Sequence, residues 1–376
     1  MREIGIGLIG TGFMGKCHAL AFGAVGATFA PPLRPRLEMV CDVEAEVAER
    51  AAREFGFAHW TTNWRDIMDA HDVRIVAITA PNALHKGMAL AAAQAGKHVY
   101  CEKPMALTLA DAEEMTEAAE RAGIATLVGY NYIRNPAVRH AKRLIEDGAI
   151  GEVSYFRGVY DEDYMADRAL PYSWRCRIKE AGTGTLGDLA CHLVSVAHFL
   201  IGPVAEVCAD IETVIRERPD PKRPGKSGAV ENEDIAHALL RFDNGTAGTL
   251  ASSRIAWGRK CGLFWEITGS RGTIQFDQER MNELRLFSAE GPADRRGFTT
   301  ILTGPAHPPY ERFCPAPGHG LGFNDLKVIE ADHLLRGIAG ETELFPDFSD
   351  ALAIERVIHG IVASAADRAW RRIRGA

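Results

Sequence analysis

Lysine, aspartate and histidine side chains can hold or transfer protons at an enzyme site, and Lys103, Asp188 and His192 are the candidates here. Lys103 follows the run 98–102, which contains β-branched Val99 and aromatic Tyr100, and it precedes a proline, as is typical of the end of a buried strand. In an open α/β sheet, the carboxyl ends of the strands face the crevice where ligands bind. Lys103 is therefore the first candidate for chemistry, and a solvated lysine at a strand end is the alternative.

Asp188 and His192 lie four residues apart in a predicted helix over 187–201, a spacing that places both on one helix face. A position at the start of the helix favours the ionised form of Asp188. The glycines just before the pair allow another backbone or a ligand to come close. The alternative is an ordinary helix-terminal charge followed by a hydrogen-bonded core histidine.

The elements that would position these residues begin with Gly10-x-Gly12-x-x-Gly15, between the strand-like run 4–9 and a helix-like run. The first glycine permits a tight turn, the second lets a pyrophosphate approach the backbone, and the third lets helix and strand pack closely. The helix N-terminus then offers N–H groups to phosphates. Asp42 ends the predicted strand 37–42, where a carboxylate binds ribose hydroxyls and disfavours a 2′-phosphate, although it could instead cap the next helix.

The fold class follows from the order of the predicted elements. Strands and helices alternate to Gly148, which indicates an N-terminal Rossmann-type doubly wound parallel sheet. From Gly151 onward, successive strands joined by short turns indicate an α+β domain with a large antiparallel sheet. We predict an NAD-binding domain over 1–133 and a substrate-binding and oligomerisation domain over 134–376, whose C-terminal helices could pack back on the first domain. Residues 290–322 are predicted to form a long ordered loop.

Composition narrows the functional classes. The net charge of −7, without a block of Lys and Arg, argues against nucleic acid as a partner. No apolar run is long enough to span a membrane, and the N-terminus enters a strand-like run without a signal peptide, so we expect a soluble, cytoplasmic protein. The eight cysteines are far apart, which argues against a zinc site or a disulfide framework, and no metal is expected.

Three motifs together carry a family resemblance: Gly10-x-Gly-x-x-Gly15, Glu102-Lys103-Pro104 and Gly187-Asp188-x-x-x-His192. In this order and separation they resemble the glucose–fructose oxidoreductase/inositol dehydrogenase/MocA (Gfo/Idh/MocA) family over essentially the whole chain. The resemblance is closest to bacterial dehydrogenases of scyllo-inositol, some of which also oxidise L-glucose. The stretches that match this branch are 160–167, 230–234, 276–284 and 322–324. Levoglucosan dehydrogenases share 293–298 and 303–308.

The resemblance implies NAD-dependent oxidation of a secondary hydroxyl of a cyclic polyol or sugar, with scyllo- or myo-inositol first and L-glucose or levoglucosan as alternatives. The cofactor accepts the hydride while protein groups manage the proton. By analogy His192 is the acid/base and Lys103 its electrostatic partner, and the reverse assignment stays open; Asp188 orients its neighbours. Many family members carry aspartate at the position of Ser195, a departure that would affect specificity and leave the chemistry intact.

Further contacts are expected with the cofactor and the substrate. The cofactor-binding candidates are Gly10, Gly12, Phe13, Met14, Gly15, Asp42, Asn82, His85, Glu102, Lys103, Asn131, Trp174 and Arg175. The substrate-binding candidates are Lys103, Asp163, Arg175, Asp188, His192 and His319. Several have plain alternatives: Asn82 as a helix cap, His85 as a solvated first-turn residue, Asn131 as a turn former and Arg175 as a surface residue.

Two expectations concern the whole protein. An open antiparallel sheet has a face to cover, so we expect a homo-oligomer, with a tetramer favoured over a dimer. The alternative to both enzyme functions, the inositol dehydrogenase and the sugar dehydrogenase, is a regulator that binds the cofactor with the same fold but catalyses no reaction. The joint presence of Lys103, Asp188 and His192 argues against it.

Overall fold

The computed structural model describes residues 2–373 of the chain. It divides into two compact units, each made of two chain segments. The first unit contains the residues up to Arg134 together with Gly322–Leu352, and the second contains Asn135–Leu321 together with the residues from Ala353 onward. The segment Gly322–Leu352, which the sequence prediction assigned to the second domain, is therefore part of the first unit.

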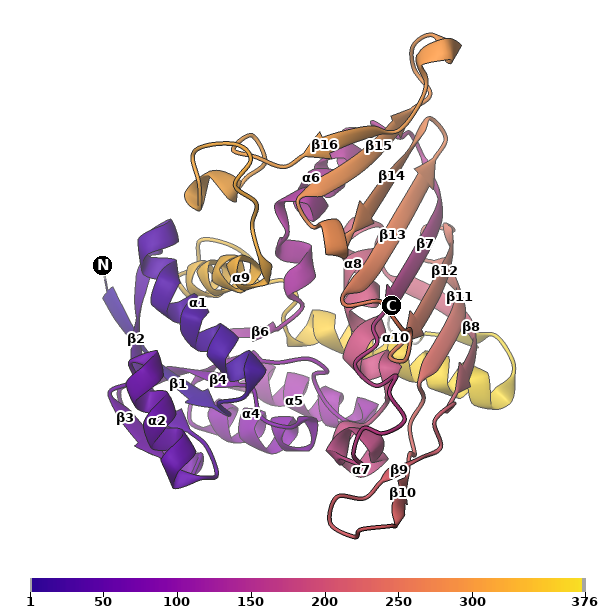
Figure 1. The fold of residues 1–376 in the computed structure, drawn as a ribbon. Helices are drawn as coiled ribbons and strands as arrows, with labels where there is room; N and C mark the ends of the chain where they lie inside the picture. Colours follow the sequence, from indigo (N-terminus) through magenta and orange to yellow (C-terminus); the bar gives the residue numbers. More distant parts are fainter. Residues whose placement is uncertain (1, 374–376) are drawn as a thin grey trace. The chain divides into compact units, whose positions relative to one another are not determined.

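The first unit is built on a six-stranded, all-parallel sheet with the strand order β3-β2-β1-β4-β5-β6 (Figure 1). Its strands are β1 (Arg2–Ile9), β2 (Leu33–Cys41), β3 (His59–Thr61), β4 (Val73–Ile78), β5 (His98–Cys101) and β6 (Thr126–Val128). This order is that of a doubly wound dinucleotide-binding sheet, in which the order of the strands reverses between β1 and β4. The predicted N-terminal Rossmann sheet is confirmed.

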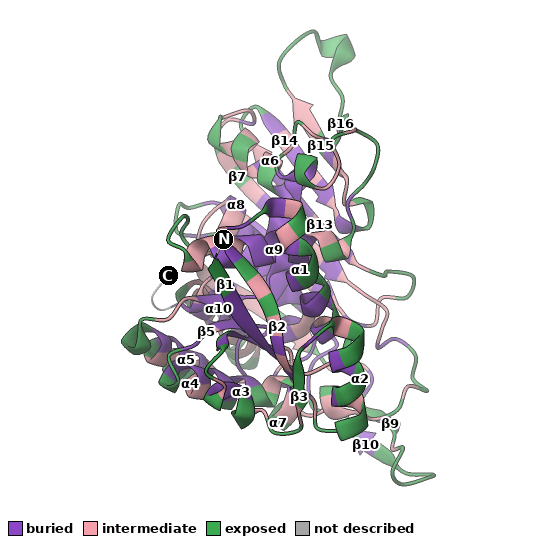
Figure 2. Ribbon diagram, turned by 90° about the vertical axis from the view of Figure 1, so that its left-hand side faces the viewer, coloured by how far each residue is buried: buried purple, intermediate pink, exposed green. Residues whose placement is uncertain are grey.

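Helices cover this sheet. They are α1 (Phe13–Phe29), α2 (Ala45–Phe55), α3 (Arg65–Asp69), α4 (His85–Gln94), α5 (Leu109–Ala122), α9 (Phe323–Ile338) and the start of α10 (Phe348–Asp367). α9 packs against α1, and in Figure 2 α2 is buried on one side and exposed on the other. Thr108 caps α5, because its Oγ1 accepts the Asp111 N–H at 3.1 Å.

The second unit is built on a nine-stranded sheet with the order β16-β15-β14-β13-β7-β12-β11-β8-β17. Its strands are β7 (Val153–Asp161), β8 (Val204–Glu212), β11 (Ile235–Phe242), β12 (Ala247–Ser253), β13 (Gly262–Gly269), β14 (Gly272–Asp277), β15 (Glu283–Ser288), β16 (Thr299–Leu302) and β17 (Arg371–Arg372). All neighbours pair antiparallel except β7 and β12, which run parallel. The predicted large antiparallel sheet is confirmed, with one parallel pair in it.

One face of this sheet is packed and the other is open. Residues along β11 and β14 alternate between buried and more exposed, as expected for a sheet covered on one face. Three helices belong to this unit besides the rest of α10: α6 (Pro136–Glu146), α7 (Ile178–Ala181) and α8 (Cys191–Leu200). α8 lies against β7 so closely that a Cβ on Gly158 would come within 2.7 Å of the Leu193 side chain.

The second unit also contains elements that the sequence prediction missed. β9 (Glu217–Pro219) and β10 (Ser227–Ala229) form a separate two-stranded hairpin. The predicted loop 290–322 contains β16 and two short 3₁₀ turns, Ala293–Arg295 and Tyr310–Arg312. None of the helices within residues 2–373 combines the length and the hydrophobicity needed to cross a membrane.

Candidate active site

The glycine loop after β1 has the geometry that its spacing predicts. Gly10 has a φ of +94°, which a side chain would strain, and a Cβ on Gly15 would lie 2.1 Å from the Gly10 carbonyl oxygen. At Gly12 no atom lies within 4 Å of the position that a Cβ would take. The loop therefore has a tight turn, a close helix–strand contact and open space at its middle glycine, as pyrophosphate binding requires.

Asp42, directly after β2, contacts this loop. Its Oδ2 accepts hydrogen bonds from the Thr11 N–H at 3.1 Å and from the Thr11 hydroxyl at 2.5 Å. The alternative role, as a cap of α2, is not found, because the residue at that N-cap position is Glu44. Asp42 is thus placed at the carboxyl end of β2, beside the glycines, where an acidic residue binds ribose hydroxyls.

Other predicted cofactor residues lie at the same end of the parallel sheet or on the first turn of α1. Asn131 begins a 3₁₀ turn after β6 and is only 2% exposed, yet its side-chain Nδ2 finds no hydrogen-bond partner among residues 2–373. A buried donor without a partner is costly unless a ligand satisfies it. Phe13 is 73% exposed and stacks on Phe323, Met14 is half-buried, and Asn82 begins a 3₁₀ turn after β4. The open space at Gly12, the Asp42 carboxylate and the unpaired Asn131 amide together fit a bound dinucleotide.

Lys103 follows β5 and is half-buried, as predicted for a residue at a strand end. The neighbouring Glu102 is buried, and its carboxylate is used inside the unit: Oε1 contacts Lys327 Nζ at 2.6 Å and His18 Nε2 at 2.7 Å, and Oε2 accepts the Lys103 N–H at 3.3 Å. The predicted contact of Glu102 with the cofactor stays a prediction. What the structure places beside Lys103 is a fixed negative charge.

His85 is buried and not solvated, which corrects the alternative considered for it. Its Nδ1 lies 3.0 Å from the Pro104 carbonyl oxygen and its Nε2 lies 2.9 Å from that of Ala80. Burial lowers the pKa of His85 below the ordinary histidine value, although the two carbonyls oppose the shift. The ring thus links the residue after Lys103 to the end of β4, and its contact with the cofactor remains a prediction.

Asp188 and His192 lie in the second unit on a helix that is not regular. The predicted continuous helix over 187–201 is a π-helical turn, Leu186–Ala190, followed by α8. Asp188 lies in the π turn and His192 in α8, and the expectation that the two share a helix face stays a prediction. Such turns occur often at functional sites. His192 is 5% exposed, and its ring centroid lies 6.1 Å from that of Tyr160.

Tyr164 holds the Asp188 carboxylate, a contact that the sequence did not reveal. Its hydroxyl donates to Asp188 Oδ2 at 2.5 Å. Burial and the negative charge of Asp188 raise the pKa of Tyr164 well above its ordinary value, so the phenol stays protonated and remains a donor. Tyr164 lies within the stretch 160–167 that carries part of the family resemblance, but no spacing pattern links it to a residue 24 positions away.

The loop before the π turn is fixed by buried polar groups that the sequence analysis also missed. Glu233 Oε1 accepts the N–H groups of Gly184 at 2.7 Å and Leu186 at 3.0 Å. Beside it, the buried pair of Arg254 and Asp234 is joined at 2.9 Å. Burial raises the pKa of Glu233, while its bonds to backbone N–H groups oppose the shift. These contacts hold the start of the helix that carries Asp188.

The remaining predicted site residues lie on the surface of the second unit or near it. Arg175 is exposed and stacks over the half-buried Trp174 at 4.5 Å. Asp163 Oδ2 is paired with Lys260 at 2.6 Å and accepts the Gly258 N–H at 3.1 Å. His319 is exposed, with Nδ1 at 3.2 Å from the Pro317 carbonyl oxygen. Their expected roles remain predictions.

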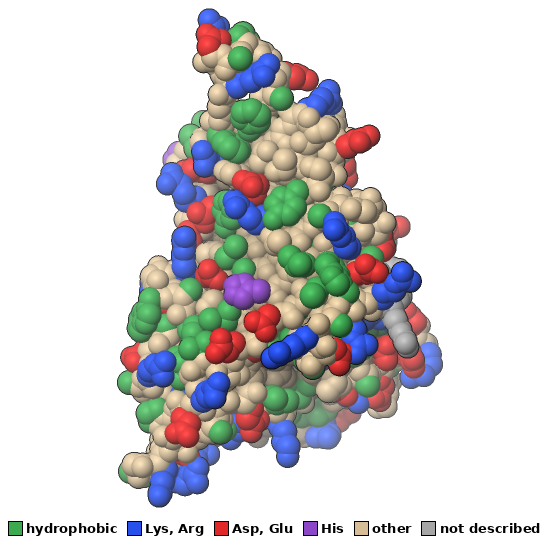
Figure 3. Space-filling model, turned by 90° about the vertical axis from the view of Figure 1, so that its right-hand side faces the viewer, with side chains coloured by type: hydrophobic (Ala, Val, Ile, Leu, Met, Phe, Trp, Pro, Cys, Tyr) green, Lys and Arg blue, Asp and Glu red, His purple; other side chains and the backbone are tan. Residues whose placement is uncertain are grey.

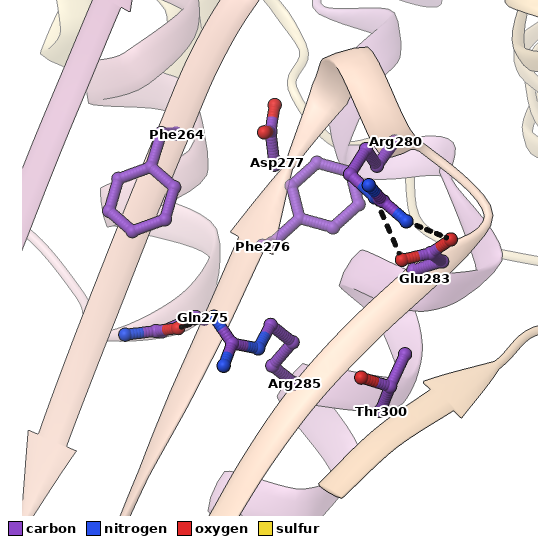
Figure 4. Close-up of a pocket in the computed structure, with 8 residues that line it drawn as sticks. All are labelled: Phe264, Gln275, Phe276, Asp277, Arg280, Glu283, Arg285 and Thr300. Carbon is purple, nitrogen blue, oxygen red and sulfur yellow. Dashed lines mark hydrogen bonds and ion pairs between the residues drawn. The ribbon is translucent and has the colours of Figure 1, made fainter. Parts of the chain in front are cut away.

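A shallow pocket of about 330 Å³ lies elsewhere, over β13–β16 of the second unit (Figure 4). Its lining residues are Phe264, Gln275, Phe276, Asp277, Arg280, Glu283, Arg285 and Thr300. None of them is a predicted site residue. Within residues 2–373 no three His, Cys, Asp or Glu side chains are grouped as metal ligands.

The strand order and the glycine loop define a dinucleotide-binding oxidoreductase fold. The chain matches the family description "Oxidoreductase family, NAD-binding Rossmann fold" over residues 4–130 and "GFO/IDH/MocA C-terminal domain" over residues 138–275. It therefore belongs to the Gfo/Idh/MocA family of NAD-binding oxidoreductases, as the three motifs indicated.

Its relatives include dehydrogenases of sugars and polyols. The chain is 41% identical to a levoglucosan dehydrogenase of Pseudarthrobacter phenanthrenivorans, and the match covers 98% of both chains. It is 28% identical to a scyllo-inositol 2-dehydrogenase (NAD(+)) of Bacillus subtilis, with 90% of this chain and 91% of the relative covered. A solved levoglucosan dehydrogenase in complex with NADH and levoglucosan superimposes with a TM-score of 0.96 at 41% identity, covering 99% of this chain and 100% of that one.

Proposed function

We propose that this chain oxidises a secondary hydroxyl of levoglucosan or a related pyranose sugar, with NAD as the hydride acceptor. The observation that carries the proposal is the 41% identity to a levoglucosan dehydrogenase over 98% of both chains. Lys103, Asp188 and His192 in this chain supply a positive charge, an orienting carboxylate and a proton acceptor, which are the groups that alcohol oxidation needs. Because of this higher identity we place levoglucosan first in the proposal, whereas the sequence alone led us to place inositols first.

In the proposed mechanism the protein manages the hydroxyl proton. NAD, when bound, supplies the chemistry of hydride acceptance. His192 takes the proton of the substrate hydroxyl, and Lys103 stabilises the negative charge that develops on the oxygen. Asp188, held by Tyr164, orients the groups around that oxygen. The glycine loop, Asp42 and Asn131 bind the dinucleotide, and Asp42 favours NAD because its charge repels a 2′-phosphate.

A second candidate substrate is scyllo- or myo-inositol. It is favoured by the stretches 160–167, 230–234, 276–284 and 322–324, which resemble the inositol branch, and by the scyllo-inositol 2-dehydrogenase among the relatives. Both substrates present ring hydroxyls to the same chemistry. A site built to hydrogen-bond particular hydroxyls rejects a wrong epimer, because a buried group is then left unpaired.

The test is a spectrophotometric assay of nicotinamide reduction with NAD or NADP and four substrates: levoglucosan, L-glucose, scyllo-inositol and myo-inositol. We expect turnover with NAD on levoglucosan. Lys103→Met should lower kcat by about a thousandfold or more, because it removes the charge that stabilises the transition state. NADH binding, followed by nucleotide fluorescence, should persist in the variant. Turnover only on an inositol would select the second substrate. NADH binding without turnover on any of the four would oppose the enzyme proposal and favour the regulator.

We further propose that the protein forms a homo-oligomer through the open face of the nine-stranded sheet, with a tetramer favoured. Figure 3 views the molecule from the side on which this sheet lies and shows hydrophobic side chains scattered among charged ones. Strand pairing places Leu239 beside Cys208 and Thr249 in one row across the sheet. Leu239 is 49% exposed, so an apolar side chain in the middle of the open face lacks cover.

A further inference from the structure

The first unit contains a buried cluster of ionisable side chains that the proposed mechanism does not use. Its members, called here the buried charge cluster, are His18, Tyr100, Glu102, Lys327 and Glu330, and each is at most 5% exposed. Lys327 Nζ lies 2.6 Å from Glu102 Oε1 and 2.9 Å from Glu330 Oε2, and the Tyr100 hydroxyl donates to Glu330. The cluster joins α1, β5 and α9.

The charges in this cluster depend on one another. Burial alone would raise the pKa of Glu102, but Lys327 and the hydrogen bond from His18 hold it well below the ordinary value. Burial alone would lower the pKa of Lys327, but Glu102 and Glu330 keep it above its ordinary value. Burial also lowers the pKa of His18, which is therefore neutral near pH 7. Lys327 is thus the only cation among the five, and it stands between two carboxylates.

The cluster reaches Lys103 through Glu102. The second oxygen of Glu102 accepts the Lys103 N–H at 3.3 Å, so the carboxylate holds the peptide from which the lysine side chain projects. Gly129 leaves room for this arrangement, because a Cβ there would lie 2.7 Å from Glu102 Oε1. The titratable or charged groups that act on Glu102 or feel its charge are His18 and Cys17 of α1, His85 of α4, Tyr100 of β5, and Lys327 with Glu330 of α9.

We propose that Lys327 is a positioning residue: its ammonium, anchored by Glu330, keeps Glu102 ionised and in place, and Glu102 in turn fixes the backbone of Lys103. A buried carboxylate that loses its cation takes up a proton or moves, because an unpaired buried charge is costly. Lys327, which lies 225 residues after Glu102 in the sequence, thereby sets the orientation of Lys103. This inference rests on the role proposed for Lys103.

The experiment compares wild type, Lys327→Met and a matched control, Lys97→Met. Lys97 is also a buried lysine of the first unit, 5% exposed, but it directly precedes β5 and donates to the carbonyls of Ala70 and Val73 at 2.8 and 2.7 Å. Three quantities are measured: hydrogen exchange of the Lys103 amide, NADH binding by fluorescence, and kcat at saturating NAD across a range of pH. The first two do not depend on turnover.

We expect Lys327→Met to bind NADH with near wild-type affinity while its Lys103 amide exchanges about tenfold faster and its kcat falls about tenfold. Glu102 without its cation takes up a proton at higher pH, so the variant should lose kcat on the acid side at a higher pH than wild type. Lys97→Met should lose stability without these changes. If Lys327 has only a structural role, Lys327→Met should be less stable, while its pH profile and its kcat at saturating NAD should match those of wild type.

Two outcomes overturn the inference: a folded Lys327→Met with wild-type Lys103 exchange and pH profile, or the same changes in Lys97→Met. If Lys327→Met does not fold, the same measurements are made on the double variant Lys327→Met/Glu330→Gln. This variant removes one charge of each sign. If wild type binds NADH but turns over no substrate, the proposed function fails, and exchange of the Lys103 amide still decides whether Lys327 positions that residue.

Discussion

The Tyr164 phenol contacts the Asp188 carboxylate, and this contact has a measurable consequence. The Tyr164 hydroxyl donates to the carboxylate at 2.5 Å. We predict that Tyr164→Phe lowers kcat/KM about tenfold, because a hydrogen bond to a charged group is worth roughly 1.5–3 kcal/mol and its loss lets Asp188 rotate. NADH affinity should not change. Steady-state kinetics and fluorescence titration measure both quantities.

The matched control for Tyr164→Phe is Tyr155→Phe in β7. It removes a hydroxyl that bonds Thr249 at 3.0 Å on the open face of the sheet. The control should keep its kcat/KM within about twofold of wild type. Equal activity of the two variants would mean that Tyr164 does not position Asp188.

Residue types and spacing predict candidate side chains for the chemistry, whose roles stay predictions, but they do not predict the residues that hold them. Lys103 and Asp42 could be found because each ends a strand, and Gly10, Gly12 and Gly15 because their spacing is a phosphate-binding pattern. Lys327 could not be found in this way. It contacts Glu102 across 225 residues, and only the fold brings α9 beside β5. Charged residues on a helix otherwise predict an exposed face, so a buried lysine of this kind leaves no local signal.

At the scale of elements, the π turn that carries Asp188 depends on Glu233. Two backbone N–H groups, those of Gly184 and Leu186, share its Oε1, and both lie just before Asp188. We predict that Glu233→Ala lowers the free energy of unfolding by about 2 kcal/mol, since buried donors left without acceptors cost about 1–3 kcal/mol each and water satisfies part of the loss. Chemical denaturation measures the change.

A neighbouring carboxylate provides the control for Glu233→Ala. Glu231 is exposed and accepts one N–H, that of Ile178, at 2.9 Å. Glu231→Ala should change the free energy of unfolding by less than about 0.5 kcal/mol, as surface substitutions usually do. A loss as large as that of Glu233→Ala would show that burial of the acceptor is not the cause.

The start of α10 gives the fold a pH dependence. Asp347 and Asp350 cap one another, with backbone N–H groups donating to the opposite carboxylates at 3.1 and 2.9 Å. Burial and the charge of Asp347 raise the pKa of Asp350 from 3.8 to about 6. Because the folded state binds this proton more tightly, the pair's contribution to stability is present below about pH 4 and declines as the pH rises through 6.

Asp350→Asn should therefore raise the melting temperature above pH 6 and leave it nearly unchanged at pH 4. The neutral asparagine amide stands in for the protonated Asp350 carboxyl group at any pH, and its oxygen still accepts the Asp347 N–H. Scanning calorimetry of both proteins between pH 4 and pH 8 measures the difference. A gain that is the same at every pH would contradict the titration of Asp350 as its origin.

Element types were predictable where the pattern was long, and short elements were not. The strand-like run 4–9 lies within β1 (Arg2–Ile9), and the strand predicted over 37–42 overlaps β2 (Leu33–Cys41). β3 has three residues and offers no alternation to detect. The π turn Leu186–Ala190 was missed because the spacing of apolar residues does not distinguish a π turn from an α-helical turn. A Cβ on Gly184, just before it, would lie 1.9 Å from the Glu233 carbonyl oxygen.

At the scale of the whole molecule, the open sheet face predicts self-association. We expect Leu239→Glu to shift the protein from oligomer toward monomer, because a charge replaces an apolar side chain in the middle of the proposed interface. Trp60→Glu is the control, since Trp60 is 43% exposed but lies in the first unit. Size-exclusion chromatography with light scattering measures the mass. A wild-type protein that elutes only as a monomer would refute the oligomer itself.

The two-segment composition of the first unit has a consequence for how the protein is made. Phe348 N–H donates to Thr126 Oγ1 at 3.0 Å, and the Pro346 carbonyl accepts the Val128 N–H at 3.0 Å, so β6 is completed by residues more than two hundred positions later. Lys327 likewise reaches Glu102 only after α9 has been synthesised. A nascent chain that has left the ribosome only as far as Arg134 therefore has all six strands of the sheet, but it lacks the residues that contact β6 and the lysine that pairs with Glu102. The unit that begins first is completed only after nearly the whole second unit has been translated.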